Sequence, residues 1–287
     1  MPPEGLRFSC ATVSLPTVPV DQAPDVVRRY GLTGIEWKVG EHPAAMRSTA
    51  APFLTKNLCT LDLSPGSAVA AAERCAEAGI ALVGLAPYID VGDEPKLNVV
   101  LEMARACGAR MIRLQAARLA PGDTYATQFQ RTRVFLENAV GRSRRYGVKL
   151  ALEIHHGTVC PSASLATTMT AGFAPEDLGV IFDPGNMVIE GYEDHRIGLE
   201  LLGDRLTHVH LKNANAQPPE HRPGPWRTNW SALDDGLLDV AGFLELLSHH
   251  DYKGWISLED LSTVRDPVET LAYNSGFLRR LGVLDPR

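Results

Sequence analysis

The chain has no surplus of positive charge and no paired cysteines. Its 287 residues carry 28 Lys and Arg against 34 Asp and Glu, a formal net charge of −6. Proteins that bind nucleic acids usually show clustered basic residues, so this balance argues against such a partner. The five cysteines are odd in number, scattered, and form no CxxC pair (Cys10, Cys59, Cys75, Cys107 and Cys160). They favour reduced, mostly buried thiols in the cytoplasm over a disulfide framework.

The chain also lacks a long apolar run. The opening MPPEGLRFSC has neither the basic nor the apolar segment of a secretory signal, and no later run approaches the ~18 apolar residues of a membrane span. We therefore expect a soluble cytoplasmic protein with no membrane partner. Hydrophobic residues make up 45% of the chain, enough for a large core, and its length suits one barrel or two modest domains.

Short apolar runs alternate with helical patterns almost from end to end. Nine runs have the composition of strands: 6–12, 34–39, 57–63, 81–87, 111–116, 149–155, 178–183, 206–212 and 254–260. Helical patterns lie between them, and several end in the glycine that favours a helix C-terminus. This alternation predicts an α/β fold, a single (β/α)8 TIM barrel over residues 1–287. The run 57–63 is the extra one and is expected in a loop after the second strand.

A doubly wound open sheet is the alternative architecture, but no strand is followed by a GxGxxG or Walker-type loop. The long stretch without strand or helix pattern runs from Asn213 to Gly236 and is rich in Pro, Asn and Trp. Unpatterned loops of this length in compact domains are usually functional or disordered. We predict that residues 213–236 cover the barrel mouth.

Acidic and imidazole groups end each of the last four predicted strands. These ends carry Glu153, Asp183, the pair His208 and His210, and Glu259. In a barrel, the C-terminal ends of the strands meet at one mouth, where such enzymes keep their chemistry. Carboxylates in one confined cleft repel unless a cation joins them, so the pattern predicts a divalent metal ion. An oxygen-rich set with one imidazole suits Mn²⁺ or Mg²⁺, with Co²⁺ or Zn²⁺ possible.

Taken alone, each of these acidic residues could have a purely structural role, because it could cap a helix or pair with Lys or Arg at the rim. Four such groups on four successive strands weaken that explanation. Earlier strands add Glu36, Lys38, Arg113 and Gln115 on inward faces. For these, ion pairing inside the barrel and contact with a substrate are equally open.

The segments LALEIHHGT, LGVIFDPGN, LTHVHLKN and WISLED resemble the xylose isomerase-like barrel superfamily of sugar phosphate isomerases and epimerases. The resemblance covers essentially the whole chain. Members include ketose 3-epimerases, inosose isomerases and dehydratases, 3-dehydroshikimate dehydratases and endonuclease IV. It implies that Glu153, Asp183, His210 and Glu259 hold one divalent metal ion, with Mn²⁺ expected. His208 would then lie one layer deeper, in the core or behind the ligands.

The same resemblance implies a metal-dependent isomerase or epimerase of a sugar, polyol or cyclitol-type ketone. In such epimerases one ligand glutamate removes a proton and the other returns one on the opposite face, through a metal-stabilised cis-enediolate. Glu153 and Glu259 would be these acid/bases. His155, in an E-x-H-x-G-T motif, would be a substrate-facing acid, base or donor, whereas His156 points the other way and is expected to pack beside the strand.

Three departures from the ketose 3-epimerase pattern disfavour ketohexose 3-epimerisation. Asn186 replaces a substrate-binding His, Val159 a Glu, and Ala216 an Arg. They leave metal-assisted enolisation intact. The alternatives are a metal-dependent dehydratase of a keto-cyclitol or dehydroshikimate-like substrate, with His155 as acid, and a non-catalytic sugar-binding barrel. Endonuclease IV is the least similar member, since its site needs more ligands on the early strands.

The predicted partner is a small carbohydrate or cyclitol, and the resemblance also implies a homo-oligomer. Asn186 could bind a substrate hydroxyl, and Lys212 an oxyanion, although a surface position for Lys212 is equally open. In GPWRTNW, Trp226 and Trp230 offer aromatic faces for a sugar ring and Arg227 suits a phosphate or carboxylate, but packing of both tryptophans on the rim is equally open. The predicted substrate contacts are His155, Asn186, Lys212, Trp226, Arg227 and Gln115.

Overall fold

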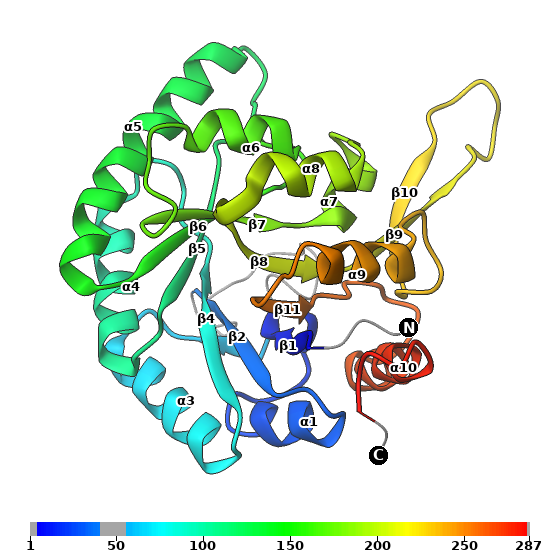
Figure 1. The fold of residues 1–287 in the computed structure, drawn as a ribbon, viewed down its shortest axis with the longest axis horizontal. Helices are drawn as coiled ribbons and strands as arrows, with labels where there is room; N and C mark the ends of the chain where they lie inside the picture. The colour runs from blue at the N-terminus through cyan, green and yellow to red at the C-terminus, as the bar shows by residue number, and fades with distance from the viewer. Residues whose placement is uncertain (1–4, 41–55, 286–287) are drawn as a thin grey trace.

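The computed structural model describes residues 5–40 and 56–285. Within these ranges, eight parallel strands close into a barrel, and the helices surround it (Figure 1). Around the barrel the strands follow one another as β1 (Arg7–Ala11), β11 (Trp255–Leu258), β8 (Leu206–Leu211), β7 (Leu178–Phe182), β6 (Lys149–Glu153), β5 (Met111–Gln115), β4 (Ala81–Pro87) and β2 (Gly34–Val39). β2 pairs with β1 and closes the ring. The predicted (β/α)8 barrel is confirmed.

The ninth apolar run is an addition to the barrel. Its strand β3 (Thr60–Leu61) has two residues and pairs with the end of β2, where Lys38 lies opposite Thr60. It therefore follows the second strand, as the sequence predicts. Residues 41–55 of this connection lie outside the described residues, as do residues 1–4 and 286–287 of the predicted domain.

Most helices begin at a side chain that caps them. The described helices of more than one turn are α1 (Ala23–Arg29), α3 (Pro65–Glu77), α4 (Glu94–Cys107), α5 (Tyr125–Ser143), α6 (Ala163–Thr170), α7 (Pro184–Ile189), α8 (His195–Leu202), α9 (Val240–His249) and α10 (Pro267–Arg280). A Ser, Thr or Asp side chain accepts a backbone N–H at the start of all of these except α1. These caps satisfy donors that the first helical turn leaves unpaired.

The core has two parts. A large apolar cluster fills the space between strands and helices. A small one inside the barrel consists of Val83, Met111, Ala151 and Ile181. Two residues further along β5, β6 and β7, the inward positions become Arg113, Glu153 and Asp183, all buried. The apolar floor of the barrel therefore gives way to a charged layer towards the C-terminal ends of the strands.

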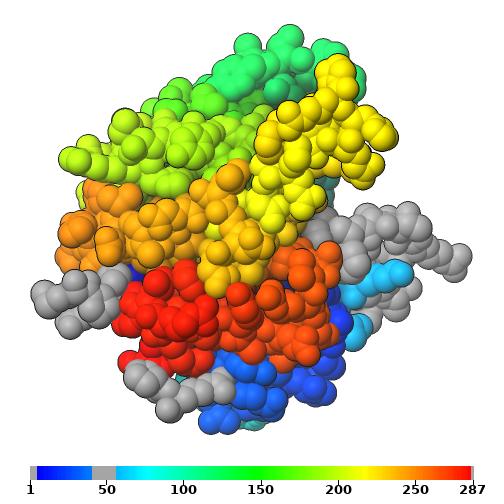
Figure 2. Space-filling model, turned by 90° about the vertical axis from the view of Figure 1, so that its right-hand side faces the viewer, coloured from blue at the N-terminus to red at the C-terminus, as the bar shows by residue number. Residues whose placement is uncertain are grey.

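The prediction that residues 213–236 have no regular structure is wrong in part. β9 (Asn213–Gln217) and β10 (Arg227–Ser231) form an antiparallel hairpin, which stands out from the barrel in Figure 1 and on the surface in Figure 2. This hairpin could not be predicted, because its strands, NANAQ and RTNWS, are polar and show no apolar alternation. Its base is fixed by buried Asn213, whose Nδ2 donates to the carbonyls of Leu233 and Leu238. Coverage of the mouth by residues 213–236 stays a prediction.

The cysteines of the chain are unpaired and mostly buried. All five cysteines are free, and all but Cys107 are buried. Burial raises the pKa of Cys10 and of Cys160 to about 12, so these thiols are poor nucleophiles. Over the part of the chain that is described, no helix has the length and apolarity needed to cross a bilayer.

Candidate metal and substrate site

Four strand ends bring one potential ligand atom each to the same place. Glu153 ends β6, Asp183 follows β7, His210 lies on β8, and Glu259 follows β11. The four ligand atoms all lie within 4.8 Å of one another, and all four residues are buried. These strands are consecutive parallel neighbours in the barrel, so their C-terminal ends open on the same side. This group of four is called the ligand cluster below.

Asp183 has contacts through both carboxylate oxygens. Its Oδ1 accepts the backbone N–H of Asn186 at 2.9 Å and caps α7. Its Oδ2 lies 2.7 Å from Lys212 Nζ and accepts the Asn186 amide at 2.6 Å. Asp183 can therefore cap α7 with one oxygen and still belong to the ligand cluster.

His210 faces the cluster with Nδ1. That atom lies 3.0 Å from Glu153 Oε1, 3.7 Å from Glu259 Oε2 and 3.9 Å from Asp183 Oδ2. Nε2 lies on the other side, 2.9 Å from Glu36 Oε2. Burial alone would lower the pKa of His210, but the carboxylates of Glu36 and Glu259 outweigh it and raise that pKa well above its usual value.

Two buried cations hold the carboxylates. Arg113 Nη1 lies 2.6 Å from Glu153 Oε2, and Lys212 Nζ ion-pairs with both Asp183 and Glu259. Gly185 permits the approach of Lys212, since a Cβ there would lie 2.4 Å from Lys212 Cγ. Lys212 is 2% exposed, so it is not a surface lysine. Its contact with a substrate stays a prediction.

The charges of this group fit a divalent ion. With neutral imidazoles, Arg113 and Lys212 leave two negative charges on the buried carboxylates, the amount that one divalent cation balances. The carboxylates counted are those of Glu36, Glu153, Asp183 and Glu259. Without a cation the protein compensates with protons, because burial raises the pKa of Asp183 to about 7 although Lys212 opposes this. Three carboxylates and an imidazole nitrogen therefore form a donor set that fits Mn²⁺ or a similar ion.

Glu153 is held most firmly. Burial would raise its pKa, but Arg113 and nearby imidazoles outweigh burial and keep the pKa of Glu153 well below its usual range. Gln115, predicted to contact substrate, donates instead to Glu153 Oε2 at 3.1 Å. Lys38, also inward, donates to Thr60 Oγ1 at 3.1 Å rather than to the cluster.

His155 is neutral, with a defined tautomer. Its Nδ1 donates to the carbonyl of His156 at 2.7 Å, which leaves Nε2 as the acceptor nitrogen. Burial lowers the pKa of His155 to about 4. The ring stacks on His156 at 4.6 Å between centroids.

Asn186, another predicted substrate contact, is committed to the protein. Its Nδ2 donates to Asp183 Oδ2 and to the carbonyl of Ile154, so its Oδ1 must be the acceptor at 2.8 Å from His156 Nδ1. A substrate would have to replace one of these bonds. His156 is therefore tied to a side chain rather than only packed beside the strand.

The base and the tip of the β9–β10 hairpin differ in position. Trp230, near the base, lies with its ring 5.1 Å from Lys212 Nζ and 5.7 Å from the His156 ring. Trp226 is 62% exposed, and Arg227, whose side chain is 70% exposed, lies 4.0 Å from Glu220. The structure thus brings Trp230 to the site, and leaves Trp226 and Arg227 in solvent.

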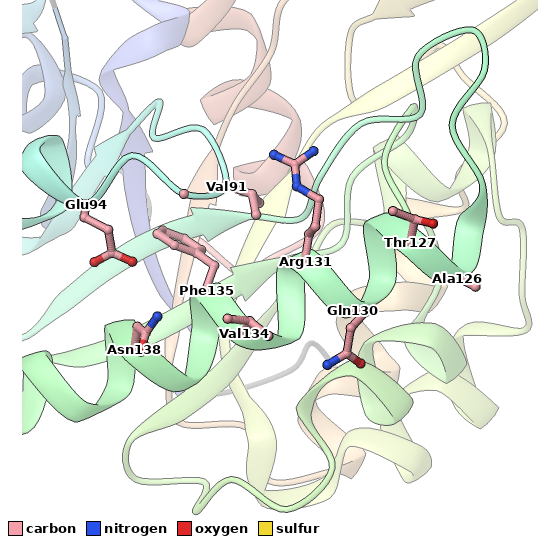
Figure 3. A pocket seen from close by; sticks show the side chains of 10 residues that line it. Val91, Glu94, Ala126, Thr127, Gln130, Arg131, Val134, Phe135 and Asn138 are labelled. Carbon is pink, nitrogen blue, oxygen red and sulfur yellow. The ribbon is translucent and has the colours of Figure 1, made fainter.

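A recess of about 420 Å³ lies beside Trp230. It is lined by His156, Ile189, Thr228, Asn229, Trp230, Leu261, Ser262 and Thr263. Contacts of His156 and Trp230 with Asn186 and Lys212 link it to the ligand cluster. A larger hollow of about 710 Å³ lies on the outside of the barrel, between the start of α4 and α5 (Figure 3), and includes no residue of the ligand cluster.

Sequence reasoning missed two features of this site. It named Trp226 and not Trp230 among the substrate contacts, and strand alternation could not have corrected this, because residues four apart share one face of a strand. It also left Glu36 without a partner, whereas the structure places it against His208 and His210. No local signal reports that contact, because 172 residues separate Glu36 from His208.

Comparisons with known proteins agree with this fold. A family model described as xylose isomerase-like TIM barrel matches residues 24–281. Among curated proteins, the inosose dehydratase of Mesomycoplasma hyopneumoniae (strain 7448) is 27% identical over 150 residues, 48% of this chain and 50% of that protein. The inosose dehydratase of Geobacillus kaustophilus is 26% identical over 132 residues, 43% of this chain and 42% of that protein. The chain thus matches about half the length of these relatives or less.

Solved structures share the fold over nearly the whole chain. The 3-keto-D-glucoside 4-epimerase of E. coli superposes with a TM-score of 0.67 at 17% identity, covering 96% of this chain and 99% of that one. The probable 3-DHS dehydratase of Bacillus anthracis gives 0.72 at 14% identity, with 96% and 99% covered. An L-ribulose 3-epimerase gives 0.71 at 16% identity, with 96% and 94% covered. At these identities the likeness shows the fold alone.

Proposed function

Because the chain belongs to the xylose isomerase-like TIM barrel family, we propose that it is a divalent-metal-dependent isomerase or epimerase of a sugar, polyol or cyclitol-type ketone. The observation that carries the proposal is the ligand cluster, with four buried ligand atoms within 4.8 Å of one another. Glu153, Asp183, His210 and Glu259 would hold the metal ion. A bound divalent ion supplies a Lewis acid that stabilises negative charge on neighbouring substrate oxygens.

Glu259 and Glu153 are the proposed acid/bases beside the substrate carbonyl. Glu153 is held through both oxygens, by His210 at Oε1 and by Arg113 and Gln115 at Oε2. Glu259 has Lys212 and, at 3.7 Å, His210 as described ion-pair partners. Glu259 is 5% exposed against 1% for Glu153. We therefore assign the proton removal to Glu259, which then holds that proton and returns it to the neighbouring carbon in an isomerisation. A return from the opposite face, as in an epimerisation, needs a proton on Glu153 first, against the effect of Arg113 on its pKa.

His155 supports isomerisation over elimination. Its Nδ1–H is committed to a backbone carbonyl, and the pKa of about 4 leaves Nε2 unprotonated at neutral pH. Such a nitrogen accepts a hydrogen bond from a substrate hydroxyl, but it is a poor acid for expelling water. Elimination would require a proton donor at the leaving hydroxyl.

The recess next to the cluster suits a hydroxyl-rich ring. Its lining offers the hydroxyls or amide of Thr228, Asn229, Ser262 and Thr263, together with the aromatic face of Trp230. The described lining carries no Lys or Arg side chain. These features support an unphosphorylated sugar or cyclitol as the ligand of this recess.

A metal-dependent dehydratase is the second candidate. It is favoured by the curated relatives, which are named inosose dehydratases. The metal ion and the base Glu259 would serve the same role, removal of a proton next to a carbonyl. The difference lies in the fate of the neighbouring hydroxyl, which stays in an isomerase and leaves in a dehydratase.

Three measurements on one sample test these alternatives. Metal content after exposure to Mn²⁺ should be about one equivalent in the wild type and should be lost in Glu259→Ala. Keto-sugars and keto-cyclitols in deuterated water should then gain carbon-bound deuterium without losing water. An unsaturated product with new ultraviolet absorbance would contradict the isomerase and establish the dehydratase. Sugar binding without metal, exchange or turnover would instead indicate a non-catalytic barrel.

A further inference from the structure

Glu36 is buried in the barrel interior but does not belong to the ligand cluster. It lies on β2, is 0% exposed, and contacts two imidazoles with one oxygen. Its Oε2 lies 2.9 Å from His210 Nε2 and 3.1 Å from His208 Nε2. Among the residues that the structure describes, its Oε1 has no hydrogen-bond partner. A buried carboxylate bonded to imidazoles alone calls for an explanation, because burial of a charge is costly unless the charge is compensated.

The contact with Glu36 determines which nitrogen of His210 is available to the cluster. A carboxylate oxygen only accepts, so His210 Nε2 must carry the hydrogen that points to Glu36. Nδ1 lies 3.0 Å from Glu153 Oε1, also an acceptor, so without a metal ion this nitrogen carries a hydrogen as well. When that proton leaves and Nε2–H stays bonded to Glu36, the lone pair resides on Nδ1. A metal ion needs that lone pair, and the opposite tautomer would present an N–H to the cluster instead.

Glu36 is itself fixed from the other side. His208 Nε2 lies 3.0 Å from Ser257 Oγ as well as near Glu36, and Ser257 Oγ lies 2.8 Å from Ser9 Oγ. His208 and His210 lie two residues apart on β8, with their rings perpendicular and centroids 5.3 Å apart. The carboxylate of Glu36 is therefore placed between two rings of one strand, and cannot turn away from His210 without losing both contacts.

These contacts require the closed barrel. β2 and β8 are not neighbours in the sheet, since β1 and β11 lie between them. Ser9 on β1 and Ser257 on β11 pair in register and fill the gap with small side chains. The long Glu36 side chain can therefore span the interior to reach β8.

We infer that Glu36 is a positioning residue that holds His210 with Nε2–H directed away from the ligand cluster and Nδ1 directed into it. The inference rests on the proposed metal-dependent function. Glu36 touches neither the cluster's carboxylates nor, on this assignment, the substrate. It acts through His210, by orienting the ring and selecting its tautomer.

A second cation held by Glu36, His208 and His210 is the competing interpretation, since these three also lie close enough to share one. It is disfavoured because a neutral imidazole has only one lone pair, so His210 could serve two cations only after losing both ring protons. The observed separations of 2.9 and 3.1 Å are those of hydrogen bonds. The two interpretations predict different metal stoichiometries.

Metal binding to full-length wild type, Glu36→Gln and Ser257→Ala tests the inference. Titration with Mn²⁺, followed by the electron paramagnetic resonance signal of free Mn²⁺, gives stoichiometry and affinity. Glu36→Gln should still bind one equivalent, but about 10- to 100-fold more weakly, the usual cost of losing a partner behind a ligand histidine. Ser257→Ala removes contacts of His208 and Ser9 but none of Glu36 or His210, and it should change affinity by less than about threefold. Unchanged affinity in Glu36→Gln, or two equivalents in the wild type falling to one, would overturn the inference.

A spectroscopic readout separates orientation from general loss of structure. With ¹⁵N-labelled histidine and diamagnetic Zn²⁺, wild-type His210 should show its ring N–H at Nε2 and none at Nδ1. Glu36→Gln should show exchange broadening or loss of that Nε2–H signal, while the signals of His208 and the melting curve report whether the fold is intact. An Nδ1–H on zinc-loaded wild type would contradict the inference without any variant.

Failure of the proposed function would look different. Wild type that binds no divalent metal would refute the metal-dependent enzyme, yet the Nε2–H of His210 in the metal-free protein would still report the bond to Glu36. A protected, downfield Nε2–H that is lost in Glu36→Gln would support the structural half of the inference. Its absence in the wild type would overturn that half too.

Discussion

The two halves of the barrel contribute different chemistry to one site. The second half, β6, β7, β8 and β11, carries the four ligand atoms at successive strand ends. The first half contributes groups that hold two of them: Glu36 on β2 contacts His210, and Arg113 and Gln115 on β5 contact Glu153. The other two, Asp183 and Glu259, pair with Lys212, which follows β8 in the second half. Substitutions in the second half should therefore remove metal binding and chemistry, whereas those in the first half should weaken stability, orientation and affinity.

Loss of a proposed acid/base in the second half should have the largest effect. Glu259→Gln keeps the size of the side chain but removes the charge, so we expect turnover to fall about 10²- to 10⁴-fold, the range for a general base. The measurement is solvent-deuterium exchange into the substrate at saturating Mn²⁺. Glu245→Gln, at an exposed position on α9, is the matched control and should be silent. A loss below fivefold in Glu259→Gln would refute the assignment.

Removal of Arg113 in the first half should mainly affect stability. Arg113→Met leaves the buried Glu153 without its guanidinium partner, and breaking such a pair costs about 3–5 kcal/mol. Urea unfolding of the metal-free protein measures this cost, and saturating Mn²⁺ should reduce it. Arg196→Met breaks an exposed pair with Glu200 and should cost less than about 1 kcal/mol. Equal losses in the two variants would show that the first half does not stabilise the ligands.

Metal affinity should rise with pH. The pKa of Asp183 is raised to about 7 by burial, and the pKa of His210 is raised by Glu36 and Glu259 against the effect of burial. Below these pKa values a metal ion must displace protons, so affinity should fall by about tenfold per pH unit for each proton released. Calorimetric titration at pH 6 and pH 8, in buffers of different ionisation enthalpy, counts those protons. A flat profile between the two pH values would contradict the raised pKa of Asp183.

The smallest effect is expected at the hairpin. Trp230→Ala removes the ring near Lys212 and His156 and should raise KM about 3- to 10-fold, in line with about 0.5–1.5 kcal/mol for an aromatic contact. Trp226→Ala, at the exposed tip, should leave KM unchanged. Steady-state kinetics on the same substrate compares them. A larger effect for Trp226 would place the tip over the site and support the mouth-covering loop.

The match between sequence and structure is good at the strand ends and poor for the polar and aromatic residues around them. The strand ends with Glu153, Asp183, His210 and Glu259 could be predicted because strand alternation and barrel closure bring groups at corresponding heights together. Asn186, Gln115, Trp226 and Arg227 could not be placed this way. Whether a polar side chain faces a substrate or a neighbouring side chain depends on contacts between strands and loops, which no local pattern records.

The sequence by itself determined the barrel and the convergence of three carboxylates and an imidazole, because both follow from the local periodicity of consecutive βα units. Only the tertiary structure decided that Lys212 is buried against Asp183 and Glu259, that Trp230 rather than Trp226 lies at the site, and that Glu36 meets His210. The physical reason is distance along the chain. Glu36 and His210 are 174 residues apart, and only closure of β2 onto β1 brings the carboxylate across the interior to β8.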